Sequence, residues 1–125
     1  MTAPTHLSYT AEHEWLAVDG QRATVGITAF AADALGDVVF IDLPAAGAAV
    51  TGGDPCGEIE STKSVSEIFA PADGEIVEVN DAVADDPALL NTDPYGDGWL
   101  FRMTLSGPVD LLDAAAYDEL TGGQE

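Results

Sequence analysis

The chain has 125 residues, of which 46% are hydrophobic, so it is long enough and apolar enough to fold as one domain with a core. Charge is its outlying property, because 23 acidic residues against 3 basic ones give a formal net charge of −20 at pH 7. Such a surface repels phosphate backbones and anionic lipids, which argues against nucleic-acid and membrane-surface roles.

The N-terminal residues 1–10 contain neither the basic segment nor the apolar stretch of a signal peptide. The single cysteine, Cys56, cannot form an internal disulfide. These features predict a cytoplasmic protein, and the high charge predicts a monomer in isolation. Residues 1–6 and 121–125 are expected to be flexible.

Short strands separated by turns dominate the rest of the chain. One or two extended segments are expected between residues 6 and 18, followed by a turn at Gly20. Further strands are expected at residues 23–28, 38–43, 55–61, 64–70, 74–80 and 98–105. Residues 85–95 are rich in turn-forming residues. The pattern predicts a mainly β barrel or sandwich in one domain spanning residues 1–125.

Two helices are expected beside the strands. Thr28 is a candidate N-cap for a short internal helix over residues 29–35, which Gly36 would end. A C-terminal helix is expected to begin near Pro108 and to run to Leu120, because its apolar residues recur at helical spacing. This second helix would cover one end or edge of the β structure.

A weak internal repeat joins residues 36–42, GDVVFID, to residues 74–80, GEIVEVN. Each segment opens with glycine and an acid, and the apolar positions then match at an offset of 38 residues: Val38 with Ile76, Val39 with Val77, and Ile41 with Val79. The repeat predicts two similar halves that form one barrel with approximate two-fold symmetry.

Lys63 is the only lysine of the chain. It lies in the segment PCGEIESTKSVSEIFAP, whose two arms alternate as strands, so Lys63 is expected at or beside the tip of a tight hairpin. The β-branched Thr62 disfavours a two-residue primed turn and favours a type I turn or a longer loop.

Three interpretations of Lys63 remain open on this chemistry alone. It is a solvated surface residue, a catalytic amine, or an attachment point for a carried group. A catalytic amine needs a buried or cationic setting, whereas Glu58, Glu60 and Glu67 favour the charged ammonium. A carrier needs a projecting amine on a stiff scaffold without competing lysines, and the sequence meets each condition.

The segment ESTKSVSEIFAPADGEIVEVN resembles the lipoyl-lysine region of the glycine cleavage system H protein family. Four more segments follow that family in order and spacing: HEW at 13–15, ATVGIT at 23–28, ALGDVVFIDLP at 34–44 and NTDPYGDGWLFRM at 91–103. The lysine of biotin carriers usually lies between two methionines, unlike Lys63. Lipoyl domains of 2-oxoacid dehydrogenase complexes are shorter and lack the HEW and NxDPYGxGW segments.

This resemblance implies a barrel-sandwich hybrid of the lipoyl-domain type, with a short internal helix and a C-terminal helix. It also implies that Lys63 carries lipoate as an amide, attached by a lipoate ligase or a lipoyl or octanoyl transferase. The implied partners are a pyridoxal-phosphate glycine decarboxylase, a tetrahydrofolate-dependent aminomethyltransferase and an FAD-dependent dihydrolipoamide dehydrogenase. The chain itself would be a non-catalytic shuttle of the aminomethyl group.

The resemblance further associates acidic residues with the loaded arm, because a carboxylate would pair with the cationic amine. Glu14 matches the glutamate of HEW. Glu67 matches a position that is often aspartate in relatives, and Glu12 a position where some relatives have serine. The two histidines show no metal-ligand spacing. Acidic surroundings would raise the pKa of the Cys56 thiol, so it is expected to be an unreactive, partly buried residue.

The same motifs also fit a lipoyl donor that relays lipoate to other complexes. An unmodified binding or regulatory module is a further alternative. An independent enzyme is disfavoured, because no nucleophile–base pair or metal constellation is present. The acidity is compatible both with steering toward basic docking surfaces and with adaptation to salt.

Overall fold

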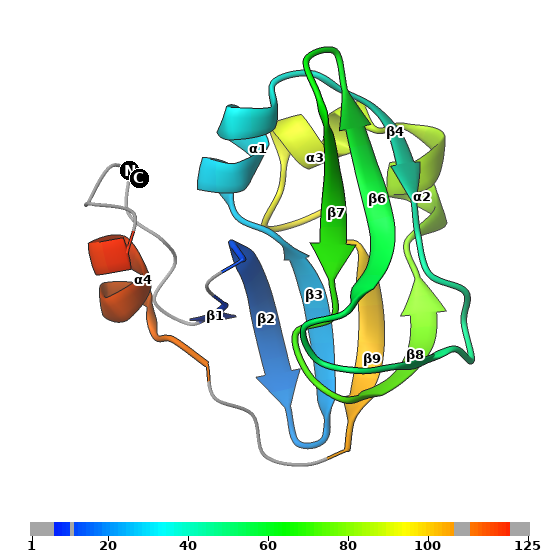
Figure 1. Cartoon of the computed structure of the whole chain (residues 1–125), viewed down its shortest axis with the longest axis vertical. Helices are drawn as coiled ribbons and strands as arrows, with labels where there is room; N and C mark the ends of the chain where they lie inside the picture. The colour runs from blue at the N-terminus through cyan, green and yellow to red at the C-terminus, as the bar shows by residue number, and fades with distance from the viewer. Residues whose placement is uncertain (1–6, 11, 107–110, 121–125) are drawn as a thin grey trace.

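The computed structural model describes residues 7–10, 12–106 and 111–120, in which two antiparallel sheets face each other (Figure 1). The six-stranded sheet has the order β1 (Ser8–Tyr9), β2 (Glu14–Asp19), β3 (Arg22–Ile27), β9 (Phe101–Leu105), β8 (Gly74–Val79) and β5 (Ala49–Val50). The three-stranded sheet has the order β4 (Val38–Asp42), β6 (Pro55–Ser61) and β7 (Val65–Phe69). The helices are α1 (Ala29–Leu35), α2 (Asp81–Asp85), α3 (Ala88–Thr92) and α4 (Ala114–Leu120).

The core forms between the two sheets, because alternate residues of each strand point inward. The large sheet contributes Val25, Ile76 and Phe101, which have no exposed surface. The small sheet contributes Ile59 and Ile68, which are almost as deeply buried. Nearly every expected strand is present, and the predicted mainly β architecture with a short internal and a C-terminal helix is confirmed.

The internal helix α1 begins and ends where the sequence predicted. The Thr28 side chain accepts a hydrogen bond from the Ala31 N–H at 3.2 Å, as an N-cap does. Gly36 follows the helix with φ 80°, a conformation that side chains disfavour. This helix covers the end of the barrel near the tip of the β6–β7 hairpin (Figure 1).

The two repeated segments form β4 and β8, one in each sheet. Each carries an irregularity of pairing at the same repeat position: β4 between Val38 and Phe40, and β8 between Ile76 and Glu78. Residues 39 and 77 therefore occupy equivalent bulges, which supports the interpretation of the repeat as two related halves.

Two parts of the chain differ from the sequence-based expectation. The turn-rich residues 85–95 include the short helix α3, and α2 ends at Asp85. The C-terminal helix begins only at Ala114, because Leu112 pairs with Tyr9 as an isolated bridge and Asp113 accepts a hydrogen bond from the Ala116 N–H at 2.8 Å. The expected start at Pro108 lies outside the described residues, as do the termini 1–6 and 121–125. No helix in the described ranges is long and apolar enough to cross a membrane.

Candidate functional site

The β6–β7 hairpin ends in a tip at the top of Figure 1. Lys63 lies at this tip and is exposed. Glu60 and Val65 form the last strand pair, and beyond it the Ser61 N–H donates to the Ser64 carbonyl at 2.8 Å, so Thr62 and Lys63 lie at the very tip. The Ser61 hydroxyl oxygen accepts hydrogen bonds from the N–H groups of Lys63 at 3.2 Å and Ser64 at 3.1 Å. The loop backbone is thereby held by a side chain, while the lysine projects from it.

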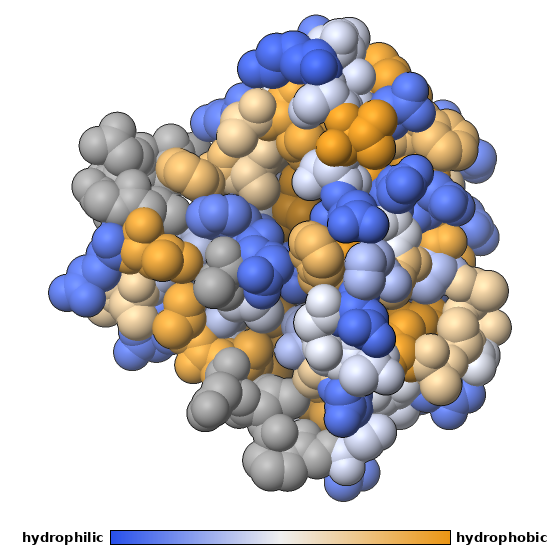
Figure 2. Space-filling view, viewed as in Figure 1, coloured by the Kyte–Doolittle hydropathy of each residue, from blue (hydrophilic) through white to orange (hydrophobic). Residues whose placement is uncertain are grey.

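A cavity of about 340 Å³ lies beside the hairpin, between α1 and β7. Figure 2 shows apolar surface at the bottom of a recess on this face. The apolar walls come from the core side of β7 and from one side of α1, and acidic residues from the start of β2 and from β7 complete the lining. The lining residues include Glu12, Glu14, Leu35, Ile59, Ser64 and Glu67.

Glu14 is the buried acid of this cavity, with 2% of its surface exposed. Its carboxyl oxygens accept hydrogen bonds from the Phe69 N–H at 3.1 Å and from the Thr10 hydroxyl at 3.3 Å. Burial raises the pKa of Glu14 to about 8, Glu12 adds to that rise, and the two hydrogen bonds oppose it. Glu14 is therefore buried in the cavity wall and is not a solvated residue of its strand.

Glu12 and Glu67 are both exposed, and they line the same cavity as Glu14. The topology thus brings together three carboxyl groups that the sequence singled out, although Glu67 lies more than fifty residues from the other two. Thr10 and the Phe69 N–H were missed by the sequence analysis. No sequence signal identified them, because their role depends on where Glu14 points.

His13, also in the cavity wall, is held by the C-terminal helix. Its Nδ1 lies 2.8 Å from the Tyr117 hydroxyl, which lies 2.7 Å from the Thr28 hydroxyl. His13 has φ 67°, an uncommon conformation for a residue with a side chain. Burial lowers the pKa of His13, against an opposing effect of Glu12. His13 therefore packs against Phe30 and hydrogen-bonds to Tyr117.

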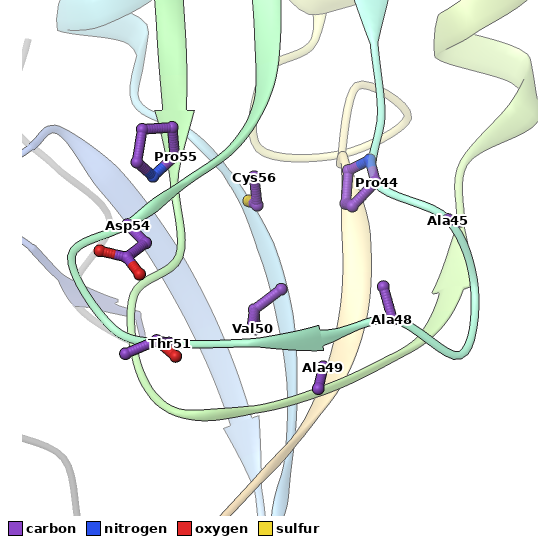
Figure 3. Close-up of a pocket in the computed structure, with 9 residues that line it drawn as sticks. All are labelled: Pro44, Ala45, Ala48, Ala49, Val50, Thr51, Asp54, Pro55 and Cys56. Atoms are coloured by element: carbon purple, nitrogen blue, oxygen red, sulfur yellow. The ribbon is translucent and has the colours of Figure 1, made fainter.

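A second cavity of about 350 Å³ lies at the other end of β6, and Figure 3 shows its lining. Its lining includes Pro44, Ala48, Val50 and Cys56, with Asp54 as the one acidic residue. Burial, with a smaller effect of Glu14, raises the pKa of Cys56 to about 12. The raised pKa disfavours the reactive thiolate near neutral pH, and its main cause is burial rather than the acidic surroundings named from the sequence.

The described part of the chain contains no group of three or more His, Cys, Asp or Glu side chains arranged to hold a metal ion. Two antiparallel sheets, with an exposed lysine at the tip of a hairpin in the smaller one, define a domain of the lipoyl type.

Comparisons with known proteins identify the family within this class. The family model described as Glycine cleavage H-protein matches residues 7–122. The Glycine cleavage system H protein of Beutenbergia cavernae is 61% identical over 124 residues, which are 99% of this chain and 100% of that protein. The protein of the same name from Thermobifida fusca is 56% identical over 125 residues and 99% of each chain.

A crystal structure of a glycine cleavage system H protein from Mycobacterium marinum gives a TM-score of 0.91 at 48% identity, over 96% of this chain and 99% of that one. The chain therefore belongs to the glycine cleavage H-protein family, the lipoyl carriers of the glycine cleavage system.

Proposed function

We propose that Lys63 carries lipoate as an amide and that the chain shuttles the aminomethyl group of glycine between enzymes. The observation that carries this proposal is the placement of the only lysine, exposed on a hairpin tip beside a cavity that contains the buried Glu14. The residues fit the group: the Lys63 side chain is exposed, and the recess beside the hairpin has apolar walls for an acyl chain and carboxyl groups for a cationic amine.

Attachment uses the neutral Lys63 amine as the nucleophile. Its nitrogen attacks the carbonyl carbon of an activated lipoyl group, the activating group leaves, and the nitrogen loses a proton, so the product is an uncharged amide. A lipoyl group attached there would supply a disulfide that accepts the aminomethyl carbon together with two electrons. The chain itself supplies presentation and protection, with no catalytic residue of its own.

Glu14 would bind the cationic amine of the cargo inside the cavity. Because burial raises the pKa of Glu14 to about 8, its carboxyl group is mostly protonated at neutral pH without a cation beside it. An ammonium group in the cavity favours the ionised form, so its entry would release a proton from Glu14. Glu67 and Glu12 would contact the arm nearer to solvent, where both lie.

The proposed partners are a pyridoxal-phosphate glycine decarboxylase, a tetrahydrofolate-dependent aminomethyltransferase, an FAD-dependent dihydrolipoamide dehydrogenase and the enzyme that attaches lipoate. The net charge of −20 supports brief, electrostatically steered contacts with basic docking surfaces. We place the protein in the cytoplasm as a monomer that meets each enzyme in turn.

The test is the intact mass of the protein purified from cells with active lipoylation, with the modified peptide mapped. We expect one lipoyl group on Lys63, with a gain of two hydrogens on reduction. The variant Lys63→Arg should fold normally but remain unmodified and inactive in glycine cleavage, because a guanidinium does not form this amide. Activity retained by Lys63→Arg, or an unmodified Lys63 in such cells, would overturn the proposal.

A further inference from the structure

The tip of the β6–β7 hairpin contacts the segment that joins α1 to β4, which passes close to it in Figure 1. The Thr62 N–H donates a hydrogen bond to the Asp37 carbonyl at 3.1 Å. The Lys63 side chain lies across Gly36, where an added methyl group would be 3.0 Å from Cε and 3.6 Å from Nζ. The direction of the lysine therefore depends on a segment far from it in sequence.

Asn91, in α3, holds that segment in turn. Its Nδ2 donates to the Gly36 carbonyl at 2.7 Å, and its Oδ1 accepts from the Val38 N–H at 2.9 Å. The two bonds bracket Asp37, whose carbonyl binds the hairpin tip. Gly36 has φ 80° and ψ −153°, which a side chain would strain, and its bare Cα leaves room for the lysine stem.

We propose that Asn91 and Gly36 are positioning residues that fix the direction in which Lys63 is presented to the enzyme that modifies it. The inference rests on the proposed function, because it takes Lys63 as the lipoylated residue. A lysine side chain on an unanchored loop samples many directions, and only some bring the amine to an activated carbonyl. The contacts of Thr62 and Gly36 restrict the hairpin tip and the stem before the enzyme binds.

The chain provides a matched control in Asn80. Its Nδ2 donates to the carbonyls of Asp97 at 2.8 Å and Trp99 at 2.7 Å, and its Oδ1 accepts from the Ala82 N–H at 3.2 Å. Asn91→Ser and Asn80→Ser thus both remove backbone contacts of an asparagine amide, but only Asn91 binds the segment that touches the hairpin tip. Both variants are compared with the parent at a temperature at which all are folded.

The experiment incubates each lipoate-free protein with a lipoate ligase, lipoic acid and ATP, and measures kcat and KM for the protein substrate. Hydrogen exchange of the Thr62 amide and the thermal unfolding midpoint are measured on the same samples. Asn91→Ser should lower kcat/KM about tenfold through lost orientation and should speed exchange at Thr62. Asn80→Ser should lower the unfolding midpoint and leave kcat/KM and Thr62 exchange close to those of the parent.

Equal kcat/KM in the parent and Asn91→Ser would overturn the inference, as would an equal loss in both variants. If Asn91→Ser does not fold, Asn91→Asp keeps the acceptor for Val38 and removes only the donor to Gly36, and the same comparison applies. A parent protein that the ligase leaves unmodified would overturn the proposed function instead. In that case, an equal rate of hydrogen exchange at the Thr62 amide in the parent and the Asn91 variant would refute the proposal that Asn91 anchors the hairpin tip.

Discussion

The fold strongly changes the chemistry of Glu14. It keeps a carboxyl group in a mostly apolar setting, with one backbone and one hydroxyl donor as partners. Its pKa in the folded state, about 8, lies well above the ordinary value of 4.5. The folded chain therefore binds this proton more tightly than the unfolded chain does. The resulting stabilisation is complete below pH 4.5 and is lost as the pH rises through about 8.

The corresponding prediction concerns Glu14→Gln. Between about pH 4.5 and 8 the parent should lose stability relative to this variant, by at most about 1.4 kcal/mol per pH unit from this one group. Urea unfolding across that range, followed by circular dichroism, gives the free energy of unfolding for each protein. The exposed Glu75→Gln serves as the control and should follow the parent. Parallel pH profiles for the parent and Glu14→Gln would show that the buried carboxyl group does not titrate in this window.

Helix α4 is the element that connects the end of the described chain to the wall of the cavity. Tyr117 is 1% exposed, stacks on Tyr9 with ring centroids 4.8 Å apart, and places its hydroxyl between His13 and Thr28. Thr28 also caps α1, which forms another wall of the cavity. The Tyr117 hydroxyl of α4 thus joins His13, which precedes Glu14, to Thr28, which begins α1.

We expect the substitutions Tyr117→Phe and Thr28→Val to be coupled. Each removes a buried hydroxyl and should cost about 1 kcal/mol, with more for Thr28→Val because it also removes the helix cap. The double variant should cost less than the sum, by about 0.5–1.5 kcal/mol, since the shared bond is lost only once. Urea denaturation of the four proteins measures this coupling. Strictly additive losses would mean that the Tyr117–Thr28 bond contributes nothing to the docking of α4.

At the scale of the whole molecule, the net charge of −20 opposes compactness. The outer side of the small sheet shows the effect locally, because Glu58 pairs with Asp42 on one neighbouring strand and with Glu67 on the other. Like charges directly opposite each other destabilise a sheet. The one salt bridge found among the described residues joins the partly exposed Arg102 and Glu78. Added salt therefore screens few attractive ion pairs.

Added sodium chloride should therefore raise the thermal unfolding midpoint, because it screens repulsion between exposed carboxylates. Glu58→Gln should stabilise the chain by about 0.5 kcal/mol at low ionic strength, and this gain should shrink as salt approaches about 1 M. Glu75→Gln is the matched control, since Glu75 pairs with Ala49 and Thr104 rather than with acids. A midpoint that falls with salt, or equal gains in both variants, would contradict this account.

Local patterns were sufficient for most of the elements and for Lys63. Alternation of apolar residues identified β6 at residues 55–61, and Thr28 with Gly36 identified α1, because strand periodicity and helix caps are properties of neighbouring residues. The local pattern did not indicate α2, α3 or the short strand β5. It also placed residues 111–113 in a helix, whereas pairing of Leu112 with the distant Tyr9 overrides that local tendency.

The sequence by itself determined a mainly β chain with a unique lysine on a hairpin, and acidic candidates near it. Only the tertiary structure decided that Glu14 is buried, because it packs the small sheet over this residue and brings the Phe69 N–H, 55 residues away, to its carboxyl group. The same holds for His13 with Tyr117, which lie 104 residues apart, and for Asn91 with the segment beneath Lys63. Such contacts depend on how sheets and helices pack, which no local periodicity specifies.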